Sequence, residues 1–517
     1  MIATLHTGTL CGVSARPVRV EVSTVRGIPG IEIVGLPEAA VRESRVRVRA
    51  ALVHSGLSLP ERKFVVNLAP ADLRKTGSSF DLAIAVGLLA ASGLCAHNQL
   101  DRTLLVGELS LDGSLLPTRG VLAQLSRAAE RTLSQAIVPA AEAGWAGLHP
   151  DIAVHLAAHL SHVVRFLDGV GELERATRDL QRPHGTGRVD LRDVRGHASA
   201  KRALEIAAAG QHHMLLFGPP GTGKTMLAAR LPTIMPEPSA HEALEIATIA
   251  SAAGTEPASS QRAWTRPFRA PHHGASGAAL IGGGDPVRPG EATLAHGGVL
   301  FLDELPEFQR SVLEGLRPTM ESGRAHVVRA RERVSMPAAP LVVAAMNPCP
   351  CGYAGDERRV CRCSPREIQR YRARLSGPLL DRFDLHVPLS RLPAHKLVND
   401  DEHQHPESSA QVRTRVEAAR ALSRARADRP RGLGRTGLEA AADELEPAAL
   451  QVLHRSVERL GLSLRAYAKV LRIARTIADL ADEQAVREPH VLEAIHYRLL
   501  DRESEQATDP WCAPKSL

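Results

Sequence analysis

Residues 218–225 read GPPGTGKT and place two glycines, a lysine and a threonine in the spacing G-x-x-x-x-G-K-[ST]. Glycines let backbone N–H groups close around phosphate oxygens, and a helix that starts here adds positive partial charge. Lys224 would reach the β- and γ-phosphates of ATP, and the Thr225 hydroxyl would bind Mg²⁺. We expect the ATP-binding residues to be Gly218, Pro219, Pro220, Gly221, Thr222, Gly223, Lys224 and Thr225.

An acidic pair follows an apolar run in GGVLFLDE, which ends at Glu304. A buried strand over 299–302 would deliver both carboxylates at its carboxyl end, where ligands bind in open α/β sheets. Asp303 would hold Mg²⁺ through water, and Glu304 would act as general base on the attacking water. A further apolar run, LVVAAMN, ends in Asn347, whose amide is suited to orienting that water. Together these residues predict ATP hydrolysis.

Two arginines complete the candidate catalytic set. Arg382 follows an apolar turn in LLDRFD, and Arg465 begins a helical pattern in SLRAYAKVLRIARTIADL. Each arginine alone is typical of a protein surface. Together they suit an arginine finger that reaches a neighbouring subunit's ATP, at Arg382, and a sensor within the same subunit, at Arg465.

Four of the seven cysteines lie within MNPCPCGYAGDERRVCRC, residues 346–363. Two C-x-C pairs, separated by nine residues, are formed by Cys349, Cys351, Cys361 and Cys363. Two pairs of thiolates can complete a tetrahedral site, so we predict a structural Zn²⁺. The alternative, four free thiols, fits an arginine-rich polar loop badly because such thiols would oxidise. The metal would stiffen the segment between Asn347 and Arg382.

Strands and helices must position these groups. An apolar strand before the glycine-rich turn and a helix after it predict α/β architecture for the middle of the chain. Alternating valines at 18, 20 and 22, together with GIEIVG and KFVVNLAP, predict strands nearer the start, and TLLVGELSLDG predicts one strand closed by an Asp-Gly turn. After a polar break, the sequence rich in Ala, Arg and Leu predicts helices to about residue 503.

Composition sets the outer bounds. A chain of 517 residues is too long for one core, and 44% hydrophobic with 23% charged residues is typical of a folded protein. No apolar run is long enough to span a bilayer and the first residues lack an export pattern, so we expect no membrane partner and a cytoplasmic location. The net charge of +7 weakly favours a polyanionic partner, while 3% aromatics exclude base stacking as its main contact.

The motifs GPPGTGKT, LFLDE, MNP, SGPLLDRFD and SLRAYAKVLRIARTIADL occur in this order, as in AAA+ ATPases. The longer runs RPFRAPHHGASGAALIGGG and RPGEATLAHGGVLFLDELPEF narrow the match, and the chain resembles the magnesium-chelatase-like ATPases of the YifB/ComM group over nearly its whole length. One departure is VRGHASAKRALE, where glutamine is expected at His197, on the adenine side of the site.

The resemblance implies an α/β fold whose first domain is like the C-terminal part of Lon protease, which is of the ribosomal S5 domain 2-like kind. The boundaries we expect are a Lon-like domain over 1–170, a linker over 171–190, an AAA+ core with the zinc insertion over 191–392, a second linker over 393–408, a helical lid over 409–503 and a tail over 504–517. The resemblance also implies a homo-hexameric ring that drives DNA branch migration in transformation and recombination. Its expected partner is single-stranded or branched DNA.

Two segments are candidates for DNA contact. One carries the adjacent His272 and His273 in a glycine-rich loop. The other, RAHVVRARERVSMPA, alternates Arg329, Arg331 and Arg333 along an expected β-hairpin, and period-two spacing would place all three guanidiniums on one face. An equally simple explanation is a charged edge strand that resists aggregation. The helicase-like relatives, whose hairpins face a pore, favour phosphate contact.

The sequence also bears on three other functions. A Lon-type peptidase needs a serine and a lysine; Ser79 is present, but Leu122 occupies the expected lysine position, so peptidase activity is rejected unless a lysine comes from elsewhere. A chelatase- or chaperone-type remodeller acting on a protein partner remains the alternative, although the chain has no D-x-S-x-S metal-adhesion motif. A scaffolding ATPase is disfavoured by the intact Glu304, Asn347 and Arg382.

Overall fold

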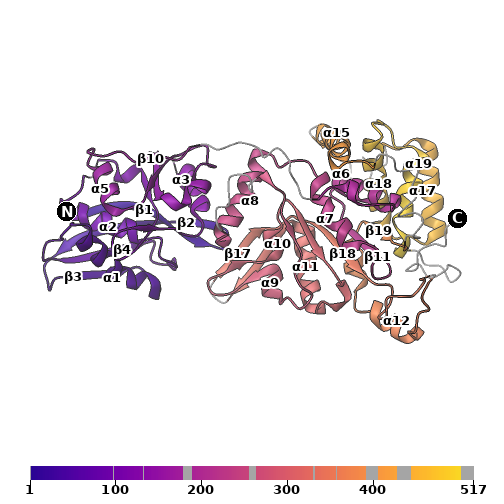
Figure 1. Cartoon of the computed structure of the whole chain (residues 1–517), viewed down its shortest axis with the longest axis horizontal. Coiled ribbons are helices and arrows are strands. Elements are labelled where there is room, and N and C mark those ends of the chain that lie inside the picture. Colours follow the sequence, from indigo (N-terminus) through magenta and orange to yellow (C-terminus); the bar gives the residue numbers. More distant parts are fainter. Residues whose placement is uncertain are drawn as a thin grey trace.

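The computed structural model describes residues 2–96, 98–131, 133–177, 189–255, 264–329, 332–356, 358–391, 406–427 and 444–501. Three parts follow one another along the long axis of the molecule (Figure 1), with the chain's start and its C-terminal helices at opposite ends. The expected tail and most of both expected linkers lie outside the described residues. Among the described helices, none combines the length and the apolar character needed to cross a bilayer.

The first part is an eight-stranded mixed sheet in the order β10-β9-β8-β5-β1-β2-β4-β3. The alternating valines lie on β2 and are buried, because they face α2, whose eleven residues are all buried. The strands are β1 (Ile2–Cys11), β2 (Ser14–Val25), β3 (Gly30–Val34), β4 (Lys63–Ala69), β5 (Thr103–Leu105), β8 (Gln135–Pro139), β9 (Ala153–Ala157) and β10 (Glu174–Arg175). The helices are α1 (Ala39–His54), α2 (Asp81–Ala91), α3 (Val121–Glu130), α4 (Ala143–Ala146) and α5 (Leu160–Leu167).

The prediction of a single strand over TLLVGELSLDG is wrong. β5 ends at Leu105, and the residues that follow form a separate hairpin of β6 (Glu108–Leu109) and β7 (Leu115–Leu116). The backbone of Gly107 hydrogen bonds to Ser79 and Leu82 at the start of α2, which draws the chain out of the sheet. The Asp-Gly turn does close the hairpin, with Gly113 in the left-handed region at φ 94°.

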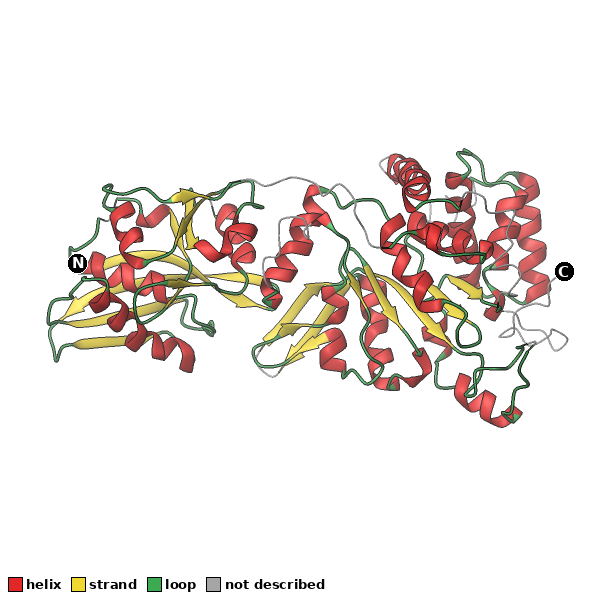
Figure 2. Ribbon diagram, viewed as in Figure 1, coloured by secondary structure: helices red, strands yellow, loops and turns green. Residues whose placement is uncertain are grey.

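The second part contains a sheet with helices packed around it (Figure 2). Its five parallel strands follow the order β12-β15-β18-β11-β19. Parallel sheets are covered on both faces, and accordingly the three central strands, β11, β15 and β18, are wholly buried. The strands are β12 (Phe268–Arg269), β15 (Val299–Leu302), β18 (Leu341–Met346), β11 (Met214–Phe217) and β19 (Leu385–Pro388). The helices are α6 (Ala198–Gly210), α7 (Lys224–Ile234), α8 (Ala240–Ala253), α9 (Gly277–Ile281), α10 (Glu291–Leu294), α11 (Arg310–Ser322), α12 (Pro365–Arg372) and α13 (Gly377–Leu380).

Two hairpins extend from this second part. They are β13 (Gly282–Gly283) with β14 (Arg288–Pro289), and β16 (Arg324–Arg329) with β17 (Glu332–Pro337). One face of the β16–β17 hairpin packs on the first part of the chain, where Val13 joins a cluster with Val327 and Val334. Gly12 has φ 63° and lies so close that an added Cβ would be 2.6 Å from a methyl carbon of Val334. The first sheet is therefore docked on the hairpin.

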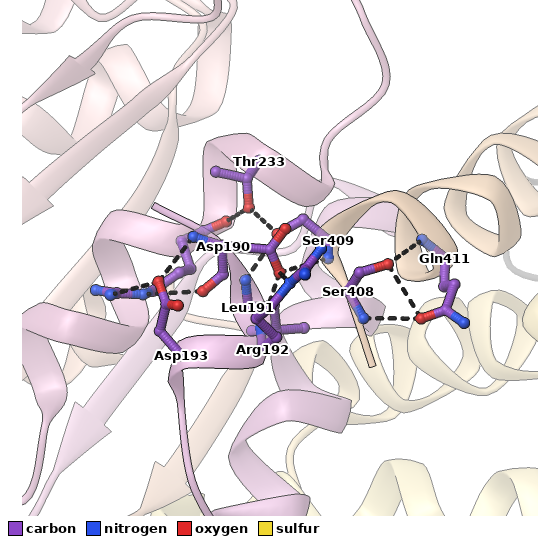
Figure 3. Close-up of polar contacts among 9 residues, drawn as sticks. Asp190, Leu191, Arg192, Asp193, Thr233, Ser408, Ser409 and Gln411 are labelled. Carbon is purple, nitrogen blue, oxygen red and sulfur yellow. Dashed lines mark hydrogen bonds and ion pairs between the residues drawn. The ribbon is translucent and has the colours of Figure 1, made fainter. Parts of the chain in front are cut away.

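The C-terminal part is helical and consists of α15 (Ser409–Ala427), α17 (Pro447–Leu460), α18 (Leu464–Leu480) and α19 (Glu488–His496). These helices share one apolar core with α6 and the five-stranded sheet. A polar joint strengthens this contact (Figure 3): the backbone N–H of Leu191 donates to Ser409 Oγ at 2.8 Å, and Asp190 Oδ1 accepts from the Ser409 N–H at 3.0 Å. Ser409 Oγ also lies 2.7 Å from Thr233 Oγ1, at the end of α7. The segment entering the core is thus fixed to the first turn of α15.

Candidate nucleotide site and cysteine cluster

The candidate catalytic groups meet at the carboxyl edge of the five-stranded sheet. β11, β15 and β18 end at adjacent positions, and the residues that follow them are Gly218, Asp303 and Asn347. β11 is also a topological switch point of the sheet, because the chain crosses from β18, on one side of β11, to β19, on the other. Ligands of open α/β sheets bind at such a switch point.

The glycine-rich turn has the local geometry that its residue types allow. Gly221 and Gly223 adopt φ of 78° and 83°, and Gly223 caps α7. A Cβ on Gly218 would lie 2.2 Å from the carbonyl oxygen of Leu389, so no other residue fits there. The N-terminus of α7 is therefore presented to the cleft as an anion-binding end.

Lys224 is held within the turn. Its Nζ donates to the carbonyl oxygens of Gly218 at 2.7 Å and Pro219 at 2.9 Å, and to Asn347 Oδ1 at 3.1 Å. Burial lowers the pKa of Lys224 to about 8, and the nearby Asp303 and Glu304 carboxylates oppose that shift. The lysine that would contact phosphates and the asparagine expected to orient water are therefore in direct contact.

The acidic pair contacts two different partners. Asp303 Oδ2 accepts a hydrogen bond from Thr225 Oγ1 at 2.9 Å, which brings the two expected magnesium-binding residues together. Glu304 has φ 51°, and its Oε2 lies 3.2 Å from Nδ1 of His273. The His273 ring in turn lies edge-on to Phe308. His273, expected to contact DNA, thus lies against the expected general base.

A cleft of about 530 Å³ lies beside the turn. Sequence reasoning identified its phosphate end but missed two arginines, Arg358 and Arg391, that line it. The signal for Arg391 was its position just after β19, and for Arg358 it was the arginine-rich run between the cysteine pairs. Burial lowers the pKa of His197, which lines the cleft where glutamine was expected. The lining residues are Asp193, Arg195, His197, Pro220, Gly221, Thr222, Gly223, Met226, Arg358 and Arg391.

The two candidate arginines lie at the other edge of the sheet. Because β19 runs parallel to β11, with Leu385 opposite Met214, Arg382 lies before the amino end of its strand. Arg382 pairs with Glu321 of α11, and burial together with the nearby Arg465 lowers the pKa of Arg382. Arg465 Nη1 lies 3.5 Å from Asp381 Oδ2. This position does not fit the expected same-chain sensor role of Arg465, since its own glycine-rich turn is at the opposite edge.

The four cysteine sulfurs form one cluster, in which every pair lies within 4.8 Å. Cys349 Sγ lies 3.4 Å from Cys351 Sγ and 3.6 Å from Cys361 Sγ. Four sulfurs at about 2.3 Å from one zinc ion would be about 3.8 Å apart, so the spacing suits a tetrahedral metal site. Two backbone N–H groups, of Cys351 and Ala354, donate to the sulfurs of Cys363 and Cys349, which is favourable for thiolates.

Comparison with known proteins places the chain in a family. Models described as magnesium chelatase subunit ChlI match residues 190–397, residues 20–142 and, for the C-terminal part of that subunit, residues 406–498. YifB of Escherichia coli K12 is 44% identical over 511 residues, which cover 97% of this chain and 98% of that protein. Competence protein ComM of Haemophilus influenzae is 43% identical over 507 residues, with the same coverage. The chain belongs to the YifB/ComM family.

Membership of the YifB/ComM family supports two of the sequence-based predictions. The match to magnesium chelatase subunits fits a mixed α/β protein with an AAA+-like core, as the parallel sheet also indicates. It also suggests an ATPase that uses ATP and Mg²⁺. A protein of Mycobacterium tuberculosis H37Rv, 40% identical over 495 residues, shows that the resemblance extends through 94% of the chain.

The candidate DNA contacts of this YifB/ComM family member are arranged differently from the expectation. Arg329 and Arg333 lie on opposite strands of the β16–β17 hairpin, and Arg331 lies outside the described residues. Arg329 pairs with Glu332, whereas Arg333 pairs with Val328. Because cross-strand partners share a face and neighbouring pairs alternate, the two arginines point to opposite faces. The prediction that the arginines share one face of the hairpin is therefore wrong. The hairpin turn interrupts the alternation of side chains between the two faces.

Proposed function

We propose that the chain is an ATP-dependent DNA motor of the ComM type, acting in branch migration as a homo-hexameric ring in the cytoplasm. One observation carries this proposal. The groups that would bind ATP lie at the carboxyl edge of the core sheet, whereas Arg382 and Arg465 lie at its amino edge. A closed ring brings the amino edge of one subunit to the nucleotide of the next, and both arginines would then act between subunits.

Within one subunit, the proposed roles follow from the contacts. Lys224 exchanges its bonds to the Gly218 and Pro219 carbonyl oxygens for the β- and γ-phosphates. Thr225 and Asp303, already 2.9 Å apart, would hold Mg²⁺, which supplies charge neutralisation on the phosphates. Asn347 orients the attacking water, and Glu304 accepts its proton.

We assign the cysteine cluster as a structural Zn²⁺ site. The four residues Cys349, Cys351, Cys361 and Cys363 fit the metal by number, type and sulfur spacing. A closed set of four thiolates leaves no open position for catalysis, which favours a structural role for the metal. Metal analysis of the purified chain should find one zinc per subunit, and a metal-free protein with full activity would remove this assignment.

DNA contact is proposed for the exposed face of the β16–β17 hairpin and for the loop that carries His272 and His273. Arg333 shares the exposed face with His326 and with Val328, which is 68% exposed. Guanidinium contact with DNA phosphates requires no base stacking, in agreement with the few aromatic residues.

The deciding experiment measures ATP turnover without DNA, with single-stranded DNA and with a branched DNA. If the chain is a motor, single-stranded or branched DNA should raise its ATP turnover, because translocation couples ATP hydrolysis to the contacts between DNA and the pore. The Glu304→Gln variant, which removes the general base, should lose about 10²–10⁴-fold of turnover in every condition and thereby assigns the activity to this site.

A chelatase- or chaperone-type remodeller is the second candidate, because the matching family models describe magnesium chelatase subunits. This alternative predicts turnover that rises with a protein partner and is indifferent to DNA. Flat rates with every nucleic acid would therefore reject the motor and favour the remodeller.

A further inference from the structure

The loop that carries the cysteine cluster lies directly on the glycine-rich turn. It begins after Asn347, which contacts Lys224. Gly352 has φ 85° and packs so closely that an added Cβ would be 2.8 Å from Cδ of Pro220. A cluster that served only to stabilise a remote surface loop would need no such contact with the phosphate-binding turn.

A second connection runs through a buried carboxylate. Asp356 lies between the two cysteine pairs, its side chain is 1% exposed, and its Oδ2 lies 2.9 Å from Nε of Arg391. Arg391 reaches the same proline as Gly352, donating from Nη2 to the Pro220 carbonyl oxygen at 3.4 Å. Its guanidinium also lies over the ring of Tyr353. The cysteine loop, the segment that follows β19 and the glycine-rich turn are thus bound to one another.

The same carboxylate shapes the segment that enters the cleft. Asp356 Oδ1 accepts from the backbone N–H of Arg358 at 2.8 Å and of Arg359 at 3.2 Å. Arg358 lines the cleft, whereas Arg359 turns to Tyr353 and donates to its hydroxyl at 2.8 Å. Two neighbouring arginines of one turn therefore have different positions, one in the nucleotide cleft and one outside it.

We propose that the cysteine loop, held in place by its metal ion, forms one side of the nucleotide site and that Arg358 contacts the nucleotide. The inference rests on the proposed ATP and zinc sites and adds that the two are coupled. The four sulfurs fix both ends of the loop, the loop fixes Asp356, and Asp356 sets the direction of Arg358 and Arg391. Loss of the metal removes the constraint on the loop, so the guanidinium of Arg358 no longer faces the bound polyphosphate.

Coupling between two sites is reciprocal, which supplies two independent measurements. Metal should tighten nucleotide binding, and nucleotide should raise the affinity for metal by the same factor. Slower release of zinc is the expected sign of that higher affinity. The direct assay measures the dissociation constant of a fluorescent ADP analogue for the full-length chain, before and after zinc is removed with a thiol reagent and a chelator. Circular dichroism checks that the stripped chain stays folded.

The reverse assay follows zinc release to a chromogenic chelator, with and without ADP, and uses only metal-loaded protein. It therefore remains informative if stripping unfolds the chain. The Arg358→Ala variant tests the proposed contact in both assays. Arg359→Ala is the matched control, because it removes an equal side chain from the same turn but outside the cleft.

Arg358→Ala should weaken ADP binding about tenfold, the usual effect of losing one charge-assisted contact. Zinc removal should weaken wild-type binding to a similar extent, with little further effect in Arg358→Ala. ADP should slow zinc release in the wild type and in Arg359→Ala, but not in Arg358→Ala.

Three results would overturn the inference. They are equal ADP affinity with and without zinc, zinc release that ADP does not change, and equal losses in the two arginine variants. A chain that binds zinc but no nucleotide would instead overturn the proposed ATPase, and a chain that binds ADP but holds no metal would overturn the zinc assignment, so the failures are distinguishable.

Discussion

At the scale of single residues, the contact between His273 and Glu304 has a consequence for regulation. The Nδ1 atom of His273 lies 3.2 Å from the carboxylate that would accept a proton from water. The imidazole therefore competes with the attacking water for the same carboxylate oxygen. We expect His273→Ala to raise DNA-free ATP turnover about fivefold, which corresponds to the loss of one hydrogen bond of ordinary strength. The response to added DNA should shrink because the resting rate is already high.

The chain offers a matched control for this prediction. His241 of α8 faces Glu245 at 3.6 Å, an exposed histidine–glutamate pair outside the nucleotide cleft. His241→Ala should leave turnover as in the wild type. A fall of DNA-free turnover in His273→Ala would mean that the histidine supports Glu304 during hydrolysis instead of restraining it.

If Lys224 binds phosphate as proposed, nucleotide affinity should depend on pH. Its pKa is lowered to about 8 by burial in the free protein, and bound phosphates would raise that pKa again because they favour the charged lysine. Below pH 8 the lysine is already protonated and affinity is constant. Above pH 8, binding must take up a proton, so the dissociation constant for ADP should rise by up to about tenfold per pH unit.

Titration calorimetry between pH 7 and pH 9.5 measures this effect, and the buffer dependence of the heat counts the proton taken up. The Lys224→Ala variant should bind weakly with little pH dependence over the same range. A wild-type affinity that stays flat up to pH 9.5 would show that Lys224 remains charged in the free protein.

At the scale of elements, the β16–β17 hairpin places Arg329 and Arg333 on opposite faces. Arg333 lies on the exposed face with Val328, whereas Arg329 is on the face that continues to Val327 and the docked first sheet. Arg333→Ala should therefore weaken DNA binding at every sequence and lower the slope of log affinity against log salt by about one per subunit that contacts DNA.

Arg329→Ala is the control from the same hairpin and should change the salt slope much less. Fluorescence anisotropy with labelled single-stranded DNA at several salt concentrations measures both variants. Equal slopes for wild type and Arg333→Ala would remove the exposed hairpin face from the proposed DNA surface.

The hairpin also shows what sequence could and could not predict. Spacing identified the glycine-rich turn, the acidic pair and the cysteine pairs because each lies within one short segment whose geometry is set locally. The arginine period failed because a turn between Arg329 and Arg333 reverses the strand, and a pattern of alternating residues does not reveal where the reversal occurs. Arg391 joins Arg358 at the cleft through tertiary contacts, among them the ion pair with Asp356, which residue spacing does not reveal.

The position of Arg465 was missed for a similar reason. Its helical context was visible in the sequence, but whether α18 presents it to the nucleotide edge depends on how the C-terminal helices pack on the core sheet. In the structure it lies beside Asp381, before the amino end of β19. Packing between distant elements, not local propensity, decides at which edge of the sheet an arginine lies.

At the scale of the whole molecule, the two edges of the core sheet predict that subunits complement one another. Lys224→Ala removes the lysine proposed to bind phosphates but keeps Arg382, and Arg382→Ala does the reverse. Each variant alone should lose about 10³-fold or more of ATP turnover, because each makes every interface incomplete. In an equal mixture, about a quarter of interfaces would join an intact lysine to an intact arginine, so up to about a quarter of wild-type turnover should return.

The control for this mixing experiment is a chain that carries both substitutions. Mixed with either single variant, it should restore nothing, because no interface then combines the two intact groups. Co-purification of an untagged variant with an affinity-tagged one, with ATP and DNA present, must show that mixed assemblies form. If they form and turnover stays at the level of the separate variants, Arg382 serves its own chain's nucleotide or none. A monomer that hydrolyses ATP at the full rate would contradict the ring itself, since the amino edge of the sheet would then have no nucleotide to reach.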